Sequence, residues 1–267
     1  MITDDRTHLV PTLREVALVV SATFFILLSI ELAWTGSGSK IKMLAYECLT
    51  VLPAMVFVIG RKYAFREVFR WRRVGSFTLL ASGLIGLGLS VVVDELDSLI
   101  QIILPMPDVL LDGLNEMMQF ETPGEFILLF LAVVVVAGIA EELLFRGFIQ
   151  GALERRLDVT RAVLLSALFF AVLHINPWWF VQILILGFVL GILAWRSQSI
   201  APGIVVHVVN NSIAFALMNS ESQSLTWYRV EGHIAPVWIV AGVVCIALGF
   251  RLFFQLTQTL VETPAPG

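Results

Sequence analysis

Two adjacent carboxylates and an arginine interrupt a long apolar stretch near the middle of the sequence. Glu141, Glu142 and Arg146 follow fifteen apolar or small residues, 126–140, and precede another apolar turn. If this stretch crosses a membrane, each charge costs about 2.5–3.5 kcal/mol at the centre of the bilayer, so such residues are rare and usually functional.

Helical spacing separates the roles of the two glutamates. Glu142 and Arg146 are four residues apart, with the acidic residue first, so they share a face and are expected to pair. Glu141 is rotated by about 100° and is not neutralised by that pair. The spacing therefore predicts that Glu142 and Arg146 are structural, whereas Glu141 is available for chemistry.

Two histidines occur in later apolar stretches without a charged neighbour in the sequence. A hairpin turn near Asp158 would place Glu141 seventeen residues before it and His174 sixteen residues after it, at nearly the same depth. His207 and Asn211 are four residues apart and could present N–H groups to an oxyanion, while Asn210 points about 100° away. The alternatives are a histidine bonded to a carbonyl and hydrogen bonds between helices.

The composition indicates an integral membrane protein. Of 267 residues, 58% are hydrophobic and only 14% are charged, whereas soluble domains carry about 25% charged residues. The net charge of -4 argues against a nucleic-acid partner. Cys48 and Cys245 lie far apart in apolar segments and are expected to be buried small hydrophobes, not disulfide or metal ligands.

Apolar stretches of membrane-spanning length predict an all-α bundle of about eight transmembrane helices. A span needs about 20 mainly apolar residues, and the first apolar stretch is too long for a cleavable signal peptide, so it should be retained. The fourth stretch is longer than a bilayer requires, and the fifth is short and ends at Asn176-Pro177. The predicted spans are 16–34, 43–60, 76–93, 126–153, 162–176, 178–195, 200–218 and 235–254.

Basic residues predict that both termini are cytoplasmic. With eight spans, thirteen of the seventeen Lys and Arg residues fall on one side, as the positive-inside rule requires. The loop Asp94–Glu125 has eight acidic and no basic residues, which suits the outside. The basic residues on the inner side are Arg6, Arg14, Arg61, Lys62, Arg66, Arg70, Arg72, Arg73, Arg155, Arg156, Arg161, Arg196 and Arg251.

Segments between the spans carry further expectations. Loop 61–73 mixes aromatic and basic residues and is expected to form an amphipathic helix that contacts anionic lipid. Segment Ser98–Leu111, broken by Pro105 and Pro107, is expected to be interfacial or re-entrant. The tail Glu262–Gly267 is expected to be disordered.

The spans also leave one conflict of depth within the candidate site. His207 lies about 10 Å from the cytoplasmic end of its span, but Glu141 lies about 18 Å from the boundary at Arg155. A tilted span, or a break at Pro177 or Pro202, would reconcile the two depths.

Three motifs on successive spans resemble the CPBP family, which comprises CAAX proteases and bacteriocin-processing (Abi) enzymes. The family signature, EExxxR, FxxxH and HxxxN, is matched by Glu141–Arg146, Phe170–His174 and His207–Asn211. The resemblance covers about residues 125–218. It divides the chain into an N-terminal three-helix region with its basic loop (1–125), a catalytic core of spans four to seven (126–218) and a C-terminal span and tail (219–267).

The resemblance implies an intramembrane endopeptidase with its active site inside the helical bundle. It assigns Glu141 as the base that activates water, with His174 assisting, His207 and Asn211 stabilising the oxyanion, and Glu142 and Arg146 supporting. One Glu, two His and one Asn could also ligate Zn²⁺, but there is no H-E-x-x-H motif and a further carboxylate would be needed as base. A metal-free mechanism without a cofactor is therefore the favoured hypothesis.

The substrate and the biological setting stay open at this stage. The resemblance implies a prenylated protein or another peptide as substrate, processed in the lipid bilayer, and leaves the oligomeric state undefined. A prokaryotic plasma membrane is expected, with the endoplasmic reticulum as the alternative. Two other functions compete with proteolysis: a non-catalytic scaffold or immunity protein of the same family, and a transporter or proton relay using the same polar side chains.

Overall fold

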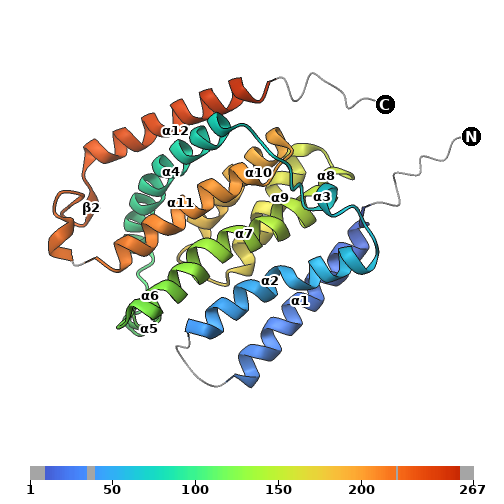
Figure 1. Ribbon diagram of the computed structural model, residues 1–267. Coiled ribbons are helices and arrows are strands. Elements are labelled where there is room, and N and C mark those ends of the chain that lie inside the picture. Colours follow the sequence, from blue (N-terminus) through green and yellow to red (C-terminus); the bar gives the residue numbers. More distant parts are fainter. Residues whose placement is uncertain (1–9, 35–39, 221, 259–267) are drawn as a thin grey trace, which may run out of the picture.

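The computed structural model is a helical bundle with one small β-hairpin, and it describes residues 10–34, 40–220 and 222–258 (Figure 1). The elements are α1 (Leu13–Ala33), α2 (Lys40–Gly60), α3 (Phe65–Val68), α4 (Ser76–Ile103), α5 (Asp108–Met118), α6 (Pro123–Phe130), the π-helix η2 (Leu131–Val136), α7 (Ala137–Glu142), the π-helix η3 (Leu143–Ile149), α8 (Gln150–Glu154), α9 (Val159–Leu173), α10 (Phe180–Ser197), α11 (Ala201–Met218), the 3₁₀-helix η4 (Ser222–Leu225), β1 (Arg229–Val230), β2 (His233–Ile234) and α12 (Pro236–Leu256).

The predicted class, an all-α multi-pass membrane protein, is confirmed. Within the described residues, seven helices are long and apolar enough to cross a bilayer. The remaining predicted span, 162–176, corresponds to α9, which is apolar but has only 15 residues. It begins after the N-cap Asp158 and ends before His174, three residues short of Pro177, so the helix-stop prediction for this segment is correct.

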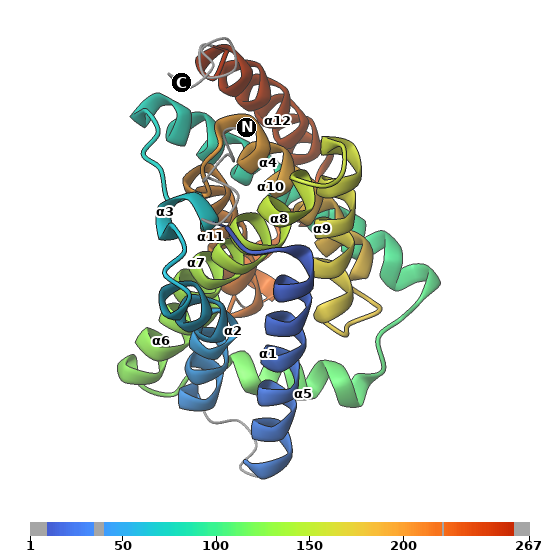
Figure 2. The same ribbon diagram turned by 90° about the vertical axis from the view of Figure 1, so that its right-hand side faces the viewer.

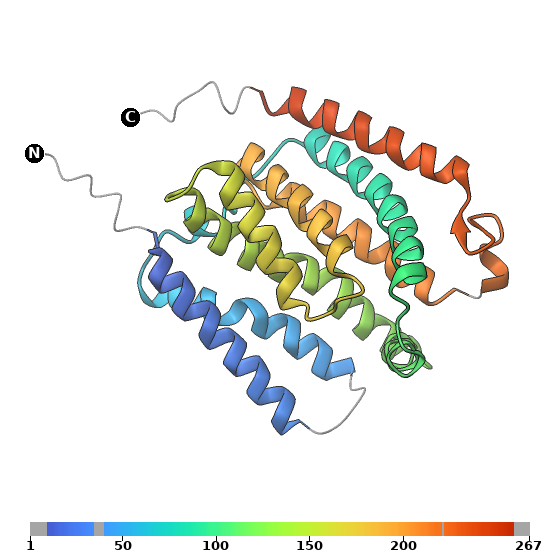
Figure 3. The ribbon, with the colours of Figure 1, turned by 180° about the vertical axis from the view of Figure 1, so that it is seen from behind.

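The helices form three adjoining groups that leave the candidate site near the centre. The α1–α2 hairpin lies on one side, the α4–α12 pair lies on the other, and α7, α9, α10 and α11 lie between them (Figures 1 and 3). One apolar core joins the groups and includes Val58 of α2, Ile85 of α4, Phe148 of η3 and Leu190 of α10, all fully buried. The division at residues 125 and 218 stays a prediction.

Contacts between loops place the basic segments at one end of the bundle. The Arg155 guanidinium donates to the carbonyl of Pro11 (3.1 Å), and Arg196 donates to Thr257 Oγ1 (3.2 Å). Arg61 pairs with Glu15 at 3.0 Å. Both ends of the described chain therefore lie at the basic end, as an even number of spans requires. Arg6 and the predicted disordered tail, 262–267, lie outside the described residues.

The fourth predicted span is a single 32-residue helix, Pro123–Glu154, which contains two π-helical segments. At about 1.5 Å per residue it is roughly 48 Å long, which exceeds the ~30 Å thickness of a hydrocarbon core. The π segments η2 and η3 flank α7, so a short α-helical stretch carries both Glu141 and Glu142. π-helical turns within α-helices occur frequently at functional sites.

Segment Ser98–Leu111, which is expected to be interfacial or re-entrant, is divided between two helices. Residues 98–103 continue α4, whose Asp94 and Glu95 are bound by Arg229 and His233 of the hairpin. The proline-containing turn then leads into α5, which lies across the bundle direction and buries no side chain (Figure 2).

Loop 61–73 does not form the expected amphipathic helix. Only the four residues of α3 are helical, and Phe69 is fully buried against Phe148, with ring centroids 6.2 Å apart. Arg70 is also buried and pairs with Glu154, whereas Trp71 is 49% exposed. The loop is thus docked on the protein, since Phe69 fills the core. Cys48 is likewise exposed and not buried as expected, although both cysteines are free.

Close packing of α4 on α12 depends on a glycine at position 88. A Cβ atom there would overlap the carbonyl oxygen of Gly242 and lie 2.9 Å from Ile246. Gly83 on the same helix is the natural control, because its Cβ would meet only Val205 at 3.8 Å, an ordinary contact distance.

We expect Gly88→Ala to lower the free energy of unfolding by about 1–3 kcal/mol, because the helix backbones must move apart. Gly83→Ala should leave it unchanged or slightly raised, because alanine is the better helix former. Thermal unfolding of the purified variants in detergent measures both. Equal stability of the two variants would show that this helix contact is not tight.

Candidate active site

Glu142 and Arg146 form a closed ion pair in the middle of the bundle. Both side chains are fully buried, and Arg146 Nη1 lies 2.8 Å from Glu142 Oε1. Arg146 Nη2 also donates to the carbonyl of Gly187 on α10 (3.1 Å), and the guanidinium lies 4.3 Å from the centre of the Phe170 ring. The pair thus ties η3 to α9 and α10, as the i, i+4 spacing predicts, and has no open side for a substrate.

Glu142 fits this position because α11 approaches it with a glycine. A Cβ atom on Gly203 would overlap Glu142 Oε2. The carboxylate cannot move aside cheaply, because its other oxygen is held by Arg146. Gly203 therefore allows α11 to pass close enough for His207, one turn further along, to reach both glutamates.

Glu141 points away from this pair toward the two histidines. Its Oε2 lies 3.6 Å from His207 Nε2 and 4.0 Å from His174 Nε2, and its side chain is 13% exposed. Both distances exceed an ordinary hydrogen bond, and the buried Oε2 has no hydrogen-bond partner among the described residues. Glu141 is thus held near basic groups without being satisfied by them.

His174 has a defined tautomer. Its Nδ1 lies 2.7 Å from the carbonyl oxygen of Phe170. A carbonyl only accepts hydrogen bonds, so Nδ1 carries the hydrogen and the neutral ring presents the lone pair of Nε2 toward Glu141. Because His174 follows the last residue of the short helix α9, its side chain is 32% exposed and gives the cluster an accessible edge.

His207 lies between the two glutamates. Its Nδ1 is 3.4 Å from Glu142 Oε1 and its Nε2 is 3.6 Å from Glu141 Oε2, and the side chain is only 3% exposed. Glu142 is paired with Arg146 and accepts hydrogen bonds, so Nδ1 carries the hydrogen in the neutral ring. Nε2 then has a lone pair and becomes a donor only when the ring is protonated.

Asn211 lies on the same face of α11 but contacts a different element. Its side-chain amide donates to the carbonyl of Val133 in η2 (2.9 Å) and its Oδ1 accepts from Asn210 (3.3 Å). A carboxamide has two N–H groups, so one of them remains for another acceptor. The structure thus brings Glu141, His174 and His207 together, with Asn211 one turn further along α11.

The conflict of depth between Glu141 and His207 does not arise in the structure. The Ile200 N–H at the start of α11 donates to the carbonyl of Arg70 (3.2 Å), and the neighbouring Phe69 backbone packs against Gly147. The start of α11 is therefore level with Gly147, six residues beyond Glu141, and His207 is six residues beyond Ala201. Neither a tilted nor a broken span is needed, because the last turns of the helix Pro123–Glu154 extend beyond the level at which loop 61–73 packs and α11 begins.

Three proton acceptors therefore converge at the centre of the site. The Nε2 atoms of His174 and His207 both lie within 4.0 Å of Glu141 Oε2. In their neutral tautomers the two rings offer lone pairs, so the cluster suits a donor with two hydrogens, such as water. A carboxylate and an imidazole that accept from one water can remove its proton, which is general-base chemistry.

Among the described residues, no group of three or more His, Cys, Asp or Glu side chains is arranged to hold a metal ion. The expectation of a metal-free site stays a prediction, which chelation can test.

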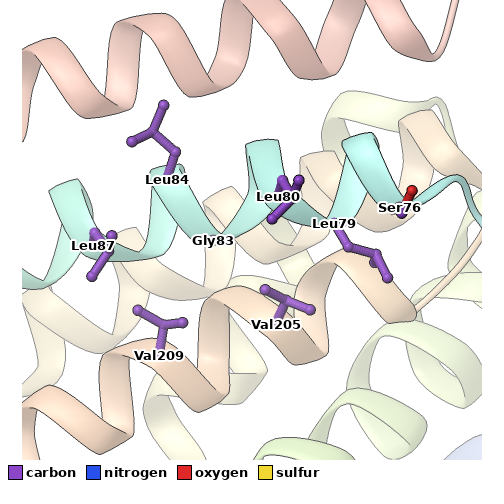
Figure 4. Close-up of a pocket in the computed structure, with 8 residues that line it drawn as sticks. All are labelled: Ser76, Leu79, Leu80, Gly83, Leu84, Leu87, Val205 and Val209. Carbon is purple, nitrogen blue, oxygen red and sulfur yellow. The ribbon is translucent and has the colours of Figure 1, made fainter.

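An apolar groove lies on the far side of α11 from His207. It runs between α4 and α11, has a volume of about 650 Å³ and is lined mostly by leucine and valine (Figure 4). Val205 and Val209 of α11 line it, two residues before and after His207, so they face away from the histidine. The groove is therefore separate from the polar cluster.

One ionisable residue near the site was missed from the sequence. Glu47 lies within the second span, on α2, and this helix packs against α7, which carries Glu141. The signal was present, because a carboxylate in the interior of an apolar span is itself unusual.

A family comparison covers the helices that carry this cluster. Residues 123–213 match the family described as type II CAAX prenyl endopeptidase, Rce1-like. The match runs from the start of α6 into α11 and includes all four predicted catalytic residues. Comparisons with curated proteins and with solved structures found no match.

Proposed function

We propose that this multi-pass membrane protein is a peptidase that hydrolyses a peptide bond of a prenylated protein or peptide, because residues 123–213 match the Rce1-like type II CAAX prenyl endopeptidase family. The observation that carries the proposal is the convergence of Glu141, His174 and His207, within 4.0 Å, beside a fully buried ion pair. A prokaryotic plasma membrane as its location stays a prediction.

In the proposed reaction Glu141 takes a proton from water while the resulting hydroxide attacks the scissile carbonyl carbon. His174 accepts the second hydrogen of the water through Nε2 and so orients it, since its Nδ1 is bound to the Phe170 carbonyl. No serine or cysteine nucleophile is needed. The part played by Glu142 is indirect: it holds His207 through Nδ1 and is itself neutralised by Arg146.

Stabilisation of the oxyanion is assigned to His207 and Asn211. Asn211 can offer its second amide N–H, because the first is bound to Val133. His207 can donate from Nε2 when both ring nitrogens carry a hydrogen, and it lies 3.6 Å from Glu141 and 3.4 Å from Glu142. Preorganised donors of this kind are worth about 10²–10³-fold each in rate.

A proton relay or transporter is less well supported by the arrangement. The ionisable side chains form one cluster on α7, α9 and α11 at a single depth, whereas a relay needs polar groups spaced along a path through the membrane. A non-catalytic scaffold would retain its function after loss of the Glu141 carboxylate, which separates it from a peptidase.

The test is cleavage of a fluorogenic peptide with a prenylated CAAX terminus by the detergent-purified protein. The matched control peptide has the same sequence without the prenyl group. We expect cleavage of the prenylated peptide, and cleavage that persists in a strong chelator.

Two results would contradict the proposal in different ways. If the chelator abolishes cleavage and Zn²⁺ restores it, the metal-free mechanism is wrong but the assignment as a peptidase still holds. A folded protein that cleaves neither peptide would contradict the proposed activity on CAAX termini.

A further inference from the structure

The two neighbouring asparagines of α11 belong to one chain of side-chain hydrogen bonds. Asn211 donates to the carbonyl of Val133 in η2 (2.9 Å), and Asn210 donates to Asn211 Oδ1 (3.3 Å). Asn210 Oδ1 in turn accepts from the hydroxyl of Ser90 on α4 (3.4 Å). The three side chains therefore connect α4 to η2 across α11.

The direction of each bond in this chain follows from its end at Val133. A backbone carbonyl only accepts hydrogen bonds, so the Asn211 atom that faces it is Nδ2 and the other is Oδ1. An amide oxygen also only accepts, so Asn210 turns its Nδ2 toward Asn211 and its Oδ1 toward the Ser90 hydroxyl. Reversing either amide would place two acceptors against each other.

Glycines bring the neighbouring helices close enough for these contacts. On α4, a Cβ atom at Gly86 would lie only 3.2 Å from the backbone of α11, and Ser90 follows Gly86 by about one turn. On α7, a Cβ atom at Gly138 would lie 2.8 Å from a valine side chain of α11. The two asparagines therefore lie on a helix that is closely packed on both sides.

The end of the chain on α4 is fixed. Ser90 is only 3% exposed, and its hydroxyl shares its hydrogen between Asn210 Oδ1 and the Gly86 carbonyl of its own helix (2.8 Å). Within the part of the chain that the structure describes, the Asn210 side chain bonds only to Ser90 and Asn211. Any effect of Asn210 on the reaction must therefore pass through Asn211.

The consequence concerns the second N–H of Asn211, which Val133 leaves free. A planar carboxamide that is held at both Nδ2 and Oδ1 cannot rotate, so the direction of this N–H is fixed. Without Asn210, the amide would be held at one atom only and could rotate. A donor that is fixed before the reaction needs no reorganisation when charge develops on the substrate, and this is what makes it effective.

We infer that Asn210 is a positioning residue of this site, which holds the carboxamide of Asn211 so that its second N–H stays directed at the oxyanion, and that Ser90 anchors Asn210 to α4. The inference rests on the proposed peptidase function, in which Asn211 stabilises the oxyanion. Asn210 itself touches neither the substrate nor the cluster of Glu141 and the histidines.

The first test measures the order of the Asn211 side chain and does not depend on activity. The sequence has five asparagines, so ¹⁵N-asparagine labelling gives few side-chain NMR signals, and the Asn211 signal is the one that Asn211→Ala loses. Its order parameter should be close to that of rigid backbone, about 0.85, in the wild type and below about 0.6 in Asn210→Leu. Leucine has nearly the shape of asparagine but cannot donate.

Ser212→Ala is the matched control for this measurement. Ser212 is the next residue of α11, and its hydroxyl bonds to the Val208 carbonyl of the same helix (2.7 Å). This variant should leave Asn211 ordered. An Asn211 side chain that is equally ordered in the wild type and in Asn210→Leu, or mobile in both, would overturn the inference whether or not the protein cleaves a peptide.

The second test is a double-mutant cycle on cleavage of the prenylated peptide. Asn211→Ala should lower kcat about 100-fold, as loss of one oxyanion donor does. Asn210→Leu should lower kcat about tenfold with little change in KM, which is the size of effect expected from one neutral hydrogen bond. The double variant should be no slower than Asn211→Ala, and Ser212→Ala should cleave normally.

Thermal unfolding of each variant shows that it is folded. Wild-type kcat in folded Asn210→Leu, or the same tenfold loss when Asn211 is already alanine, would show that Asn210 does not act through Asn211. A folded wild-type protein that cleaves no prenylated peptide would instead contradict the proposed function, and the NMR result would still decide whether Asn210 positions Asn211.

Discussion

Glu141→Gln is expected to lower the rate of peptide cleavage by about 10³-fold or more while leaving the fold intact. Glutamine has the shape of glutamate but cannot accept the proton of water, and loss of a general base typically costs 10²–10⁴-fold. The substitution also removes a buried acceptor that has no hydrogen-bond partner, so stability should be unchanged or higher. Single-turnover cleavage and thermal unfolding of the same preparation measure the two effects.

His174→Ala provides an informative comparison with Glu141→Gln. His174 lies at the exposed edge of the cluster, and its loss removes the orientation of the water but leaves the base, so a smaller loss of rate is expected. The control is Glu31→Gln, which removes a carboxylate that pairs with Lys42 in the α1–α2 hairpin and should therefore leave cleavage normal. A folded Glu141→Gln protein with wild-type cleavage would contradict the assignment of Glu141 as the base.

The second large effect concerns stability. Arg146→Met or Glu142→Leu alone should lower the free energy of unfolding by about 3–5 kcal/mol, because each leaves a buried charge without its partner. Both side chains are fully buried and 2.8 Å apart, so solvent cannot compensate. The double variant should recover most of the loss, because replacing a buried ion pair by apolar residues is often neutral or stabilising.

Activity should not recover together with stability in the double variant. Glu142 Oε1 lies 3.4 Å from His207 Nδ1 and sets the orientation of that ring. The double variant is therefore expected to be folded but slow, measured by chemical unfolding in detergent and by peptide cleavage. If the double variant is no more stable than either single variant, an unpaired buried charge is not the reason for the loss of stability in the single variants.

The division of labour between the two glutamates was predictable from the sequence because it depends only on helical periodicity. Glu142 and Arg146 pair as an i, i+4 couple, and Glu141 turns toward His174 across a hairpin whose turn at Asp158 is marked by an N-cap. These are local rules that the π-helical segments on either side do not disturb. The number and order of the long helices followed from the same apolar lengths.

Features that depend on packing between distant segments were not predictable. The basic loop was expected at the lipid surface, but Phe69 fills a space that only the folded bundle creates beside Gly147 and Phe148. The depth of His207 was misjudged because nothing local indicates that α11 begins level with Gly147. Glu47 was overlooked because only the folded bundle packs its helix, α2, against α7, which carries Glu141.

The most direct test of the central claim, metal-free activation of water by Glu141, is hydrolysis of the prenylated peptide in ¹⁸O-labelled water with a strong chelator present. We predict that the wild-type protein places one ¹⁸O atom in the new terminal carboxyl group under these conditions, and that Glu141→Gln does so at a rate about 10³-fold lower. Incorporation by wild type only after Zn²⁺ is added, or equal incorporation by Glu141→Gln, would contradict the claim.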